Sequence, residues 1–239
     1  MQYMILRRAD QGTEAEGFPP PQLVQAVPSA KWLHPSASGV RMRRAGGTWD
    51  VRPAPFAPDD ESVNELVAGF AMIEADSREQ ALARAASWPT ADGEGNAVLE
   101  VREAGCPGGC VGFDTGAAPT SRAYAVLLRS DAASEADLEP PPSVIDTMNR
   151  ANQAGVKAGI ALAGEGLKST KRGGRVKFSG GKPTIIDGPF AEVKELIAGY
   201  WLIQADTLEQ AMEWVRHYPF PHPDALEVEL RTVHIPARA

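Results

Sequence analysis

The chain has 239 residues, of which 43% are hydrophobic and 23% charged, enough for one large domain or two domains of ordinary size. Its 24 lysines and arginines against 31 acidic residues give a formal net charge of −7, which disfavours general binding to nucleic acid or to anionic membranes. No apolar run approaches the roughly 18–20 residues that span a bilayer, and the N-terminal charge order is not that of a secretory signal. We therefore expect a soluble, cytoplasmic protein without a nucleic-acid or membrane partner.

Two segments of the chain resemble each other strongly. Residues 65–89 and 195–219 are identical at 11 of 25 aligned positions, where chance gives about one or two. Between them lies a stretch rich in glycine, proline and alanine with no apolar period, which is typical of a linker. We therefore predict a tandem duplication with a first module over 1–103, a linker over 104–122 and a second module over 123–239.

Each module is predicted to contain the same elements in the same order. In the first we expect a strand over 3–8, a short helix within 20–32, a hairpin around Gly46-Gly47, a strand over 69–75, a helix and a strand over 97–102. In the second we expect the strand 124–129, the helix 142–154, a hairpin around Gly180-Gly181, the strand 199–205, a helix and the strand 226–233. The motifs Ser77-x-x-Gln80 and Thr207-x-x-Gln210 are capping boxes that start the later helix of each module.

This order is close to the ferredoxin-like βαββαβ plan and predicts an α+β protein of two such modules. An antiparallel sheet with helices on one face leaves its other face apolar, and two such faces bury each other. We expect an intrachain dimeric α+β barrel with a cleft between the modules. In aligning the final strands, Leu99–Arg102 is matched to Leu226–Glu229.

A nine-residue segment carries a family resemblance. Residues 187–195, read as DGPFAEVKE, resemble the signature of the DGPF family within the YCII-related proteins, and Leu33-His34-Pro35-Ser36 is similar to a segment upstream of that signature. The resemblance implies a dimeric α+β barrel of ferredoxin-like units. It also implies, for some relatives, a His–Asp acid/base pair acting on small ring compounds, and an association with sigma factors. In the first module the signature is degenerate.

The candidate site follows from that resemblance and from the fold. We hypothesise that His34 of the first module faces Asp187 of the second as a composite catalytic pair, in lyase- or isomerase-like chemistry. Glu192, Lys194 and Glu195 are the candidate ligand-binding residues. A structural interpretation competes with this one, because Asp before Gly-Pro forms a rigid Asx-type turn and the following charges form a solvated ion-pair cluster.

Three other features point less clearly to a function. Lys168 to Lys182 holds six basic residues and no acidic one, which is typical of a solvated hairpin or of a contact with an acidic partner. Cys106 and Cys110 lie in the linker and are taken as free thiols, with a zinc or redox role as the alternative. The histidines show no metal-site spacing, since His217, His222 and His234 are assigned to a helix end, a turn and a strand end.

The sequence thus favours binding of a small polar or ring-containing molecule in the cleft between the modules, without a cofactor or a metal. The alternative is a non-catalytic interaction or regulatory module that meets a protein partner, in a system with a transcription (sigma) factor. The chain is compatible with a monomer or a homodimer.

Overall fold

Two antiparallel sheets form the framework of the protein, whose computed structural model describes residues 1–54, 63–188, 196–221 and 225–236. The first half contains β1 (Gln2–Arg8), α1 (Pro21–Ala26), β2 (Lys31–Trp32), β3 (Val40–Ala45), β4 (Thr48–Pro53), β5 (Val67–Glu74), α3 (Arg78–Ala86) and β6 (Val98–Glu103). After β7 (Phe113–Asp114), the second half contains β8 (Arg122–Arg129), α4 (Ala132–Glu135), α5 (Pro142–Lys157), β9 (Ala161–Gly166), β10 (Gly174–Ser179), β11 (Lys182–Asp187), β12 (Ile197–Ala205), α6 (Leu208–His217) and β13 (Ala225–Thr232). Three short 3-10 turns complete the described elements: Ser36–Ser38, Asp92–Gly95 and Thr170–Arg172.

The predicted helix starts are confirmed. The hydroxyl of Ser77 accepts from the backbone N–H of Gln80 at 3.2 Å, and Thr207 accepts from Gln210 at the same distance. Each glutamine side chain reaches back to the backbone N–H of the residue before the cap, at 2.6 and 2.9 Å. These bonds satisfy N–H groups that have no partner inside the helix, which is why α3 and α6 begin where the sequence indicates.

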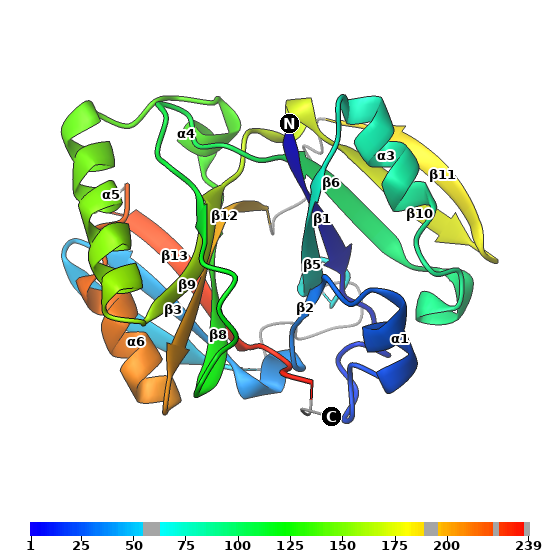
Figure 1. The fold of residues 1–239 in the computed structure, drawn as a ribbon, viewed down its shortest axis with the longest axis horizontal. Coiled ribbons are helices and arrows are strands. Elements are labelled where there is room, and N and C mark those ends of the chain that lie inside the picture. Colours follow the sequence, from blue (N-terminus) through cyan, green and yellow to red (C-terminus); the bar gives the residue numbers. More distant parts are fainter. Residues whose placement is uncertain (55–62, 189–195, 222–224, 237–239) are drawn as a thin grey trace.

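The two hairpins lie in the sheet of the opposite half. One sheet has the order β11-β10-β6-β1-β5-β2, and the other has β4-β3-β13-β8-β12-β9-β7. In Figure 1 the yellow hairpin β10–β11 extends the first-half sheet at β6, while the light-blue hairpin β3–β4 lies beside β13. Each hairpin therefore follows the element order of its own module along the chain but pairs with the sheet of the other half. The strand that completes the ferredoxin-like sheet of the first half is β2, which pairs with β5. In the second half it is β9, which pairs with β12.

Cross-strand ion pairs and close backbone packing hold the exchanged hairpins. Arg41 of β3 stands opposite Glu229 of β13, and Arg175 of β10 stands opposite Glu100 of β6. Just before each hairpin lies a glycine whose replacement by a larger residue would collide with the strand it joins. A Cβ at Gly39 would press on the Leu230 carbonyl, and one at Gly173 would press on the Val101 carbonyl. The two hairpins thus dock through matching contacts.

The last strands of the two halves, β6 and β13, are equivalent to each other in a register that differs by two residues from the predicted alignment. Glu100 stands opposite Leu6 of β1, and Glu229 stands opposite Leu127 of β8. Leu99 therefore occupies the position of Val228 rather than that of Leu226. A shift of two residues keeps every side chain on the same face of a strand, so hydrophobic alternation alone does not distinguish the two alignments.

The two sheets pack face to face with the helices outside (Figure 1). Apolar side chains of both sheets fill the space between them, and the rings of Phe70 and Tyr200 meet there with their centroids 4.7 Å apart. This confirms the α+β class and the burial of one sheet on the other. The described strands remain in two sheets, linked at two corners by the isolated bridges Leu33–Val233 and Ala104–Leu167.

Part of the predicted linker is built into the second sheet. Phe113 and Asp114 form β7 and pair with β9. Ahead of β7, Cys106 and Cys110 form a disulfide with their Cα atoms 5.4 Å apart, so the prediction of two free thiols is wrong.

The strand β9 is absent from the sequence prediction because Ala161–Gly166 is rich in alanine and glycine, which have low β-propensity. The strand forms because its backbone pairs with β12 on one side and with β7 on the other, despite the low β-propensity of its residues.

Candidate functional site

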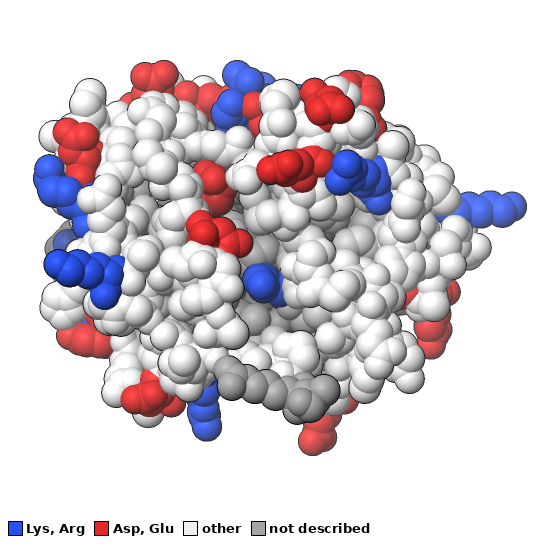
Figure 2. Space-filling view, viewed as in Figure 1, with Lys and Arg blue, Asp and Glu red and all other residues white. Residues whose placement is uncertain are grey.

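A cavity of about 380 Å³ lies between the two halves at one corner of the molecule. The space-filling view shows the surface hollowed along the line between the halves, with acidic and basic side chains nearby (Figure 2). First-half, linker and second-half residues all contribute to its wall, which is largely apolar. Its lining includes Val24, Trp32, Ala117, Pro119, Leu162, Leu202 and Val233. Among the described residues a buried apolar cluster occupies the space between the sheets, and this cavity borders it at one corner.

Two histidines meet beside this cavity and define what we call the histidine corner, with the bridge Leu33–Val233 at its base. The backbone N–H of His34 donates to the Thr232 carbonyl at 2.9 Å, and that of His234 donates to the Trp32 carbonyl at 2.8 Å. This pairing sets the imidazole rings edge to face with 5.6 Å between centroids. His234 lines the cavity, and His34 lies behind it.

Both imidazoles favour the neutral form. Burial lowers the pKa of His234. Burial also lowers the pKa of His34, and the nearby His234 and Arg231 lower it further, while a hydrogen bond with the Phe18 backbone acts in the opposite direction. An ordinary histidine has a pKa of about 6.5. At pH 7 each ring therefore presents a lone pair, which accepts a proton or a hydrogen bond.

Two charged residues belong to the cavity wall, and one buried polar atom of a lining residue lies behind it. Lys31 and Asp114 place one charge of each sign there, both on exposed residues. The indole nitrogen of Trp32 is buried and has no hydrogen-bond partner among the described residues. A buried donor without a partner is rare in native proteins and calls for an acceptor. Apolar walls with a few polar groups are the usual make-up of a small-molecule site.

His34 and Asp187 belong to different contact networks. Asp187 ends β11 on the first-half sheet, is 78% exposed and pairs with Arg78 at 2.5 Å. The carbonyl oxygen of His34 accepts instead from Arg231 at 2.6 Å, on the second-half sheet. No contact between the described atoms joins the two side chains, so the composite pair stays a prediction. Glu192, Lys194 and Glu195 lie outside the described residues, as does His222.

Buried arginine–glutamate clusters lie under the two bridged corners. Glu100 has no exposed surface and accepts from Arg8 at 2.6 Å, Arg102 at 3.1 Å and Arg175 at 2.9 Å. The equivalent cluster is built on Glu229, which accepts from Arg41 and Arg231, each at 2.9 Å. Arg231 holds the carbonyl of His34, and Arg102 holds that of Lys168 at 2.6 Å. The clusters therefore position the chain at each corner.

Half of the predicted basic stretch is absorbed by internal contacts. Lys168 pairs with Glu103 at 2.7 Å, Arg172 pairs with Asp137 at 3.5 Å, and Arg175 is bound in the Glu100 cluster. The three other basic side chains are exposed: Lys171, Lys177 and Lys182. This segment therefore helps to dock the exchanged hairpin, which weakens the case for a basic surface that meets an acidic partner.

Sequence reasoning found His34 and missed His234. His234 follows β13 and is predicted only as a strand end, because its neighbour in space is 200 positions away in the chain (234 − 34). The signal that could have found it is the repeat itself. Once the final strands are aligned correctly, His234 and His34 fall at the two positions that correspond to Gly105 and Lys168, which meet at the other bridged corner.

The fold and this geometry define an α+β protein of two ferredoxin-like units. Residues 123–233 match the family model of the YCII-related domain, the family whose signature residues 187–195 resemble. An uncharacterized protein of Rhizobium meliloti (strain 1021) is similar to the chain, with 29% identity over 110 residues, which cover 45% of this chain and 89% of that protein. Within the described residues, no helix is long and apolar enough to cross a membrane, and no three histidine, cysteine or acidic side chains gather as a metal site.

Proposed function

We propose that the protein binds a small ring-containing carboxylate in the cavity between its two halves, with His234 contacting the carboxylate and His34 supporting it. The observation that carries this proposal is a largely apolar cavity of about 380 Å³ with the histidine pair beside it. Lys31 supplies a positive charge at the cavity wall for a carboxylate.

The same site offers acid/base chemistry on the bound ring. A neutral imidazole next to a ligand abstracts a proton most effectively when its pKa lies near the working pH. We include His34 in this proposal as the ring that packs edge to face against His234 and fixes its orientation, and we leave out Asp187, which pairs with Arg78.

We further infer that the halves 1–103 and 123–239 are a tandem duplication in which one corner was kept for binding. The matching hairpin contacts, the paired clusters on Glu100 and Glu229 and the two bridges support this origin. At the lysine corner, formed by Lys168 and the bridge Ala104–Leu167, Lys168 pairs with Glu103. Its charge is thereby taken up inside the protein, whereas the histidine corner borders the cavity.

The test is an NMR titration of the histidine rings with benzoate and its uncharged analogue benzamide. Without ligand, the rings of His34 and His234 are expected to titrate below the ordinary value, as their lowered pKa values require. Benzoate should raise both pKa values, because a nearby negative charge favours the protonated ring, and should therefore bind more tightly as the pH falls.

The exposed His217 ring serves as the internal control, and adding benzoate should leave its NMR signals in place. His234→Gln should remove most of the benzoate affinity and leave the fold intact, since its backbone rather than its ring makes the corner pairing. Millimolar benzoate could leave the NMR signals and the pKa values of the His34 and His234 rings unchanged, while other compounds stabilise the protein by binding elsewhere. In that case the proposed site is incorrect.

A further inference from the structure

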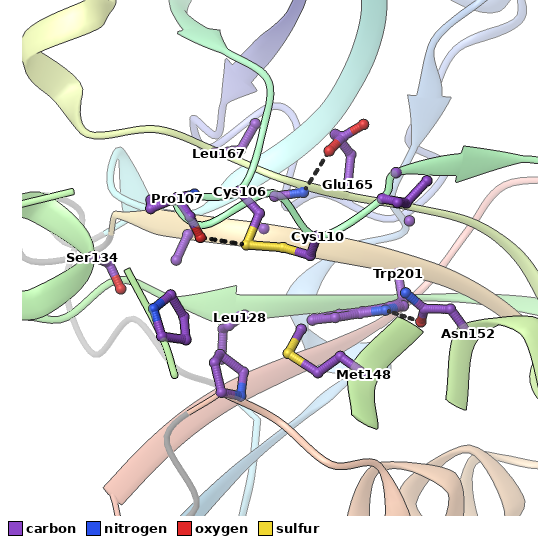
Figure 3. A pocket seen from close by; sticks show the side chains of 18 of the residues that line it. Cys106, Pro107, Cys110, Leu128, Ser134, Met148, Asn152, Glu165, Leu167 and Trp201 are labelled. Carbon is purple, nitrogen blue, oxygen red and sulfur yellow. Dashed lines mark hydrogen bonds between the residues drawn. A yellow bond between two sulfur atoms is a disulfide. The ribbon is translucent and has the colours of Figure 1, made fainter. Parts of the chain in front are cut away.

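A second pocket, separate from the cavity between the halves, lies between the second sheet and α5 (Figure 3). Trp201 of β12, Leu128 of β8 and Gly164 of β9 form its floor, and Met148 of α5 forms one side. None of its lining residues lines the cavity at the histidine corner. The pocket is mainly apolar and has a volume of about 70 Å³.

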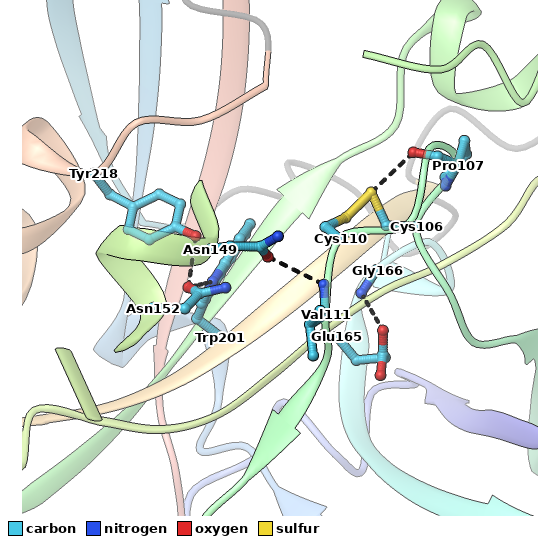
Figure 4. Close-up of a disulfide and its surroundings, with 10 residues drawn as sticks. All are labelled: Cys106, Pro107, Cys110, Val111, Asn149, Asn152, Glu165, Gly166, Trp201 and Tyr218. Atoms are coloured by element: carbon cyan, nitrogen blue, oxygen red, sulfur yellow. Dashed lines mark hydrogen bonds between the residues drawn. A yellow bond between two sulfur atoms is a disulfide. The ribbon is translucent and has the colours of Figure 1, made fainter. Parts of the chain in front are cut away.

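The disulfide loop 106–112 forms the opposite wall of this pocket. Cys106 packs directly on Gly166, where an added Cβ would lie 2.9 Å from the cysteine. The loop is also held at its far end, because the Val111 N–H donates to the Asn149 side chain at 3.1 Å (Figure 4). Between these two attachments the Cys106–Cys110 bond closes a tight ring that borders the pocket (Figures 3 and 4).

Two polar side chains give the pocket its chemical preference. The Asn152 oxygen accepts from the Trp201 indole at 3.1 Å and from the Tyr218 hydroxyl at 2.7 Å, and its amide nitrogen points away from these donors toward Val111 (Figure 4). Glu165 also lines the pocket, and burial raises its pKa against an opposing hydrogen bond from the Gly166 N–H. A carboxyl in such a site disfavours an anionic ligand, and the amide offers a donor to a neutral oxygen.

We propose that this pocket is a second binding site, for a small uncharged ring compound that carries a hydroxyl or carbonyl group, and that reduction of the Cys106–Cys110 disulfide opens it. The size of the pocket supports a gate. A cavity that holds benzene measures about 150 Å³, so the pocket of about 70 Å³ under the closed loop takes only part of a ring. Movement of the disulfide loop is the direct way to enlarge it, because the loop lies opposite a sheet and a long helix; the segment around Leu138 and Pro140 and the residue Pro221 complete the rim.

The gating step is thiol–disulfide exchange with a dithiol reductant. One thiolate of the reductant attacks a sulfur of the disulfide and forms a mixed disulfide, and its second thiol then releases the protein thiol. The S–S bond of the protein is replaced by two S–H groups, while the reductant loses two electrons and two protons and becomes a disulfide. The disulfide loop 106–112 then loses the cross-link between Cys106 and Cys110.

The experiment measures binding of phenol to the full chain, followed through the Trp201 indole and Gly166 amide NMR signals, with and without excess dithiothreitol. Reduction should tighten the apparent Kd by about tenfold, as expected when the open loop rises from roughly a tenth of the population to most of it. The double variant Cys106→Ser/Cys110→Ser should bind like the reduced protein whether or not dithiothreitol is present.

The readouts separate this site from the one at the histidine corner. Phenol should shift the Trp201 and Gly166 signals and leave the His234 ring unchanged, and benzoate should do the reverse. Equal phenol affinity in the oxidised and reduced wild-type protein would overturn the gate, and a Trp201 signal that phenol moves in neither state would overturn the site. Neither result depends on whether benzoate binds between the halves.

Discussion

Replacing Glu100 by glutamine is expected to lower the free energy of unfolding by about 3–5 kcal/mol, the usual cost of removing one partner from a buried ion pair. Glu100 has no exposed surface and binds three arginines from β1, β6 and the exchanged strand β10. The amide keeps the shape of the side chain but removes the charge that compensates these cations. Glu229→Gln should have an effect of the same size, because Glu229 is equally enclosed. Urea unfolding followed by circular dichroism measures both.

A matched control lies on the same strand as Glu229. Glu227 is 35% exposed and approaches Arg129 only to 3.9 Å, so Glu227→Gln should cost no more than about 1 kcal/mol. If Glu100→Gln and Glu227→Gln lose similar amounts, the buried clusters do not hold the hairpins as described.

The loss caused by Glu100→Gln should shrink in acid. Burial alone would raise the pKa of the Glu100 carboxyl, but Arg8, Arg102 and Arg175 outweigh it and hold the pKa well below the ordinary value. A carboxylate with a lowered pKa in the folded state adds stability above its unfolded pKa, about 4.3, and loses that stability as the pH falls. The wild-type protein should therefore approach the variant below about pH 4.

Alanine at Gly39 or Gly173 is expected to destabilise the protein by about 1–3 kcal/mol each, the range typical of overpacking. Both glycines have extended backbone angles that any residue adopts, so the cost is steric. The added methyl group would strike the backbone carbonyl of Leu230 or of Val101, on the strand that receives the hairpin. Thermal or urea unfolding of each variant gives the value.

The double variant provides a stricter test of this packing. The two glycines lie at different corners, so their effects should add to within about 0.5 kcal/mol. Gly12→Ala is the control, because its added methyl group would meet only one side-chain oxygen, that of Asp10, at 3.2 Å rather than a backbone carbonyl at much closer range. A double variant as stable as this control would show that the hairpins do not pack where the structure puts them.

Local signals in the sequence predict the elements well. The capping boxes fix the starts of α3 and α6, and the glycine pairs at 46–47 and 180–181 mark both hairpins. These features depend on residues close together in the chain. The pairing of whole strands depends instead on residues far apart in the chain. The exchange of hairpins between the sheets rests on contacts of Arg41 with Glu229 and of Arg175 with Glu100, which no local pattern specifies.

The candidate site was harder to predict for the same reason. The resemblance around His34 pointed to a corner of the molecule that borders a cavity, but the ring that lines the cavity belongs to His234, at the other end of the chain. Asp187 ends β11 and pairs with Arg78 of α3, in the other half of the chain, while the turn predicted after it lies mostly outside the described residues. The disulfide loop was unpredictable from spacing, because Cys-x-x-x-Cys in a glycine-rich segment fits free thiols as well as a bond.

The exchange of hairpins explains why the two halves act as one unit. Each sheet needs a strand pair from the other half, and the buried clusters that receive these pairs also hold the backbone carbonyls of His34 and Lys168 at the bridged corners. The most direct test is a set of nuclear Overhauser contacts between backbone protons of neighbouring strands. We predict cross-peaks from Met42 to Val228 and from Val176 to Leu99. Cross-peaks that join β3 to β6 and β10 to β13 instead would contradict the exchange and, with it, the way the site is built.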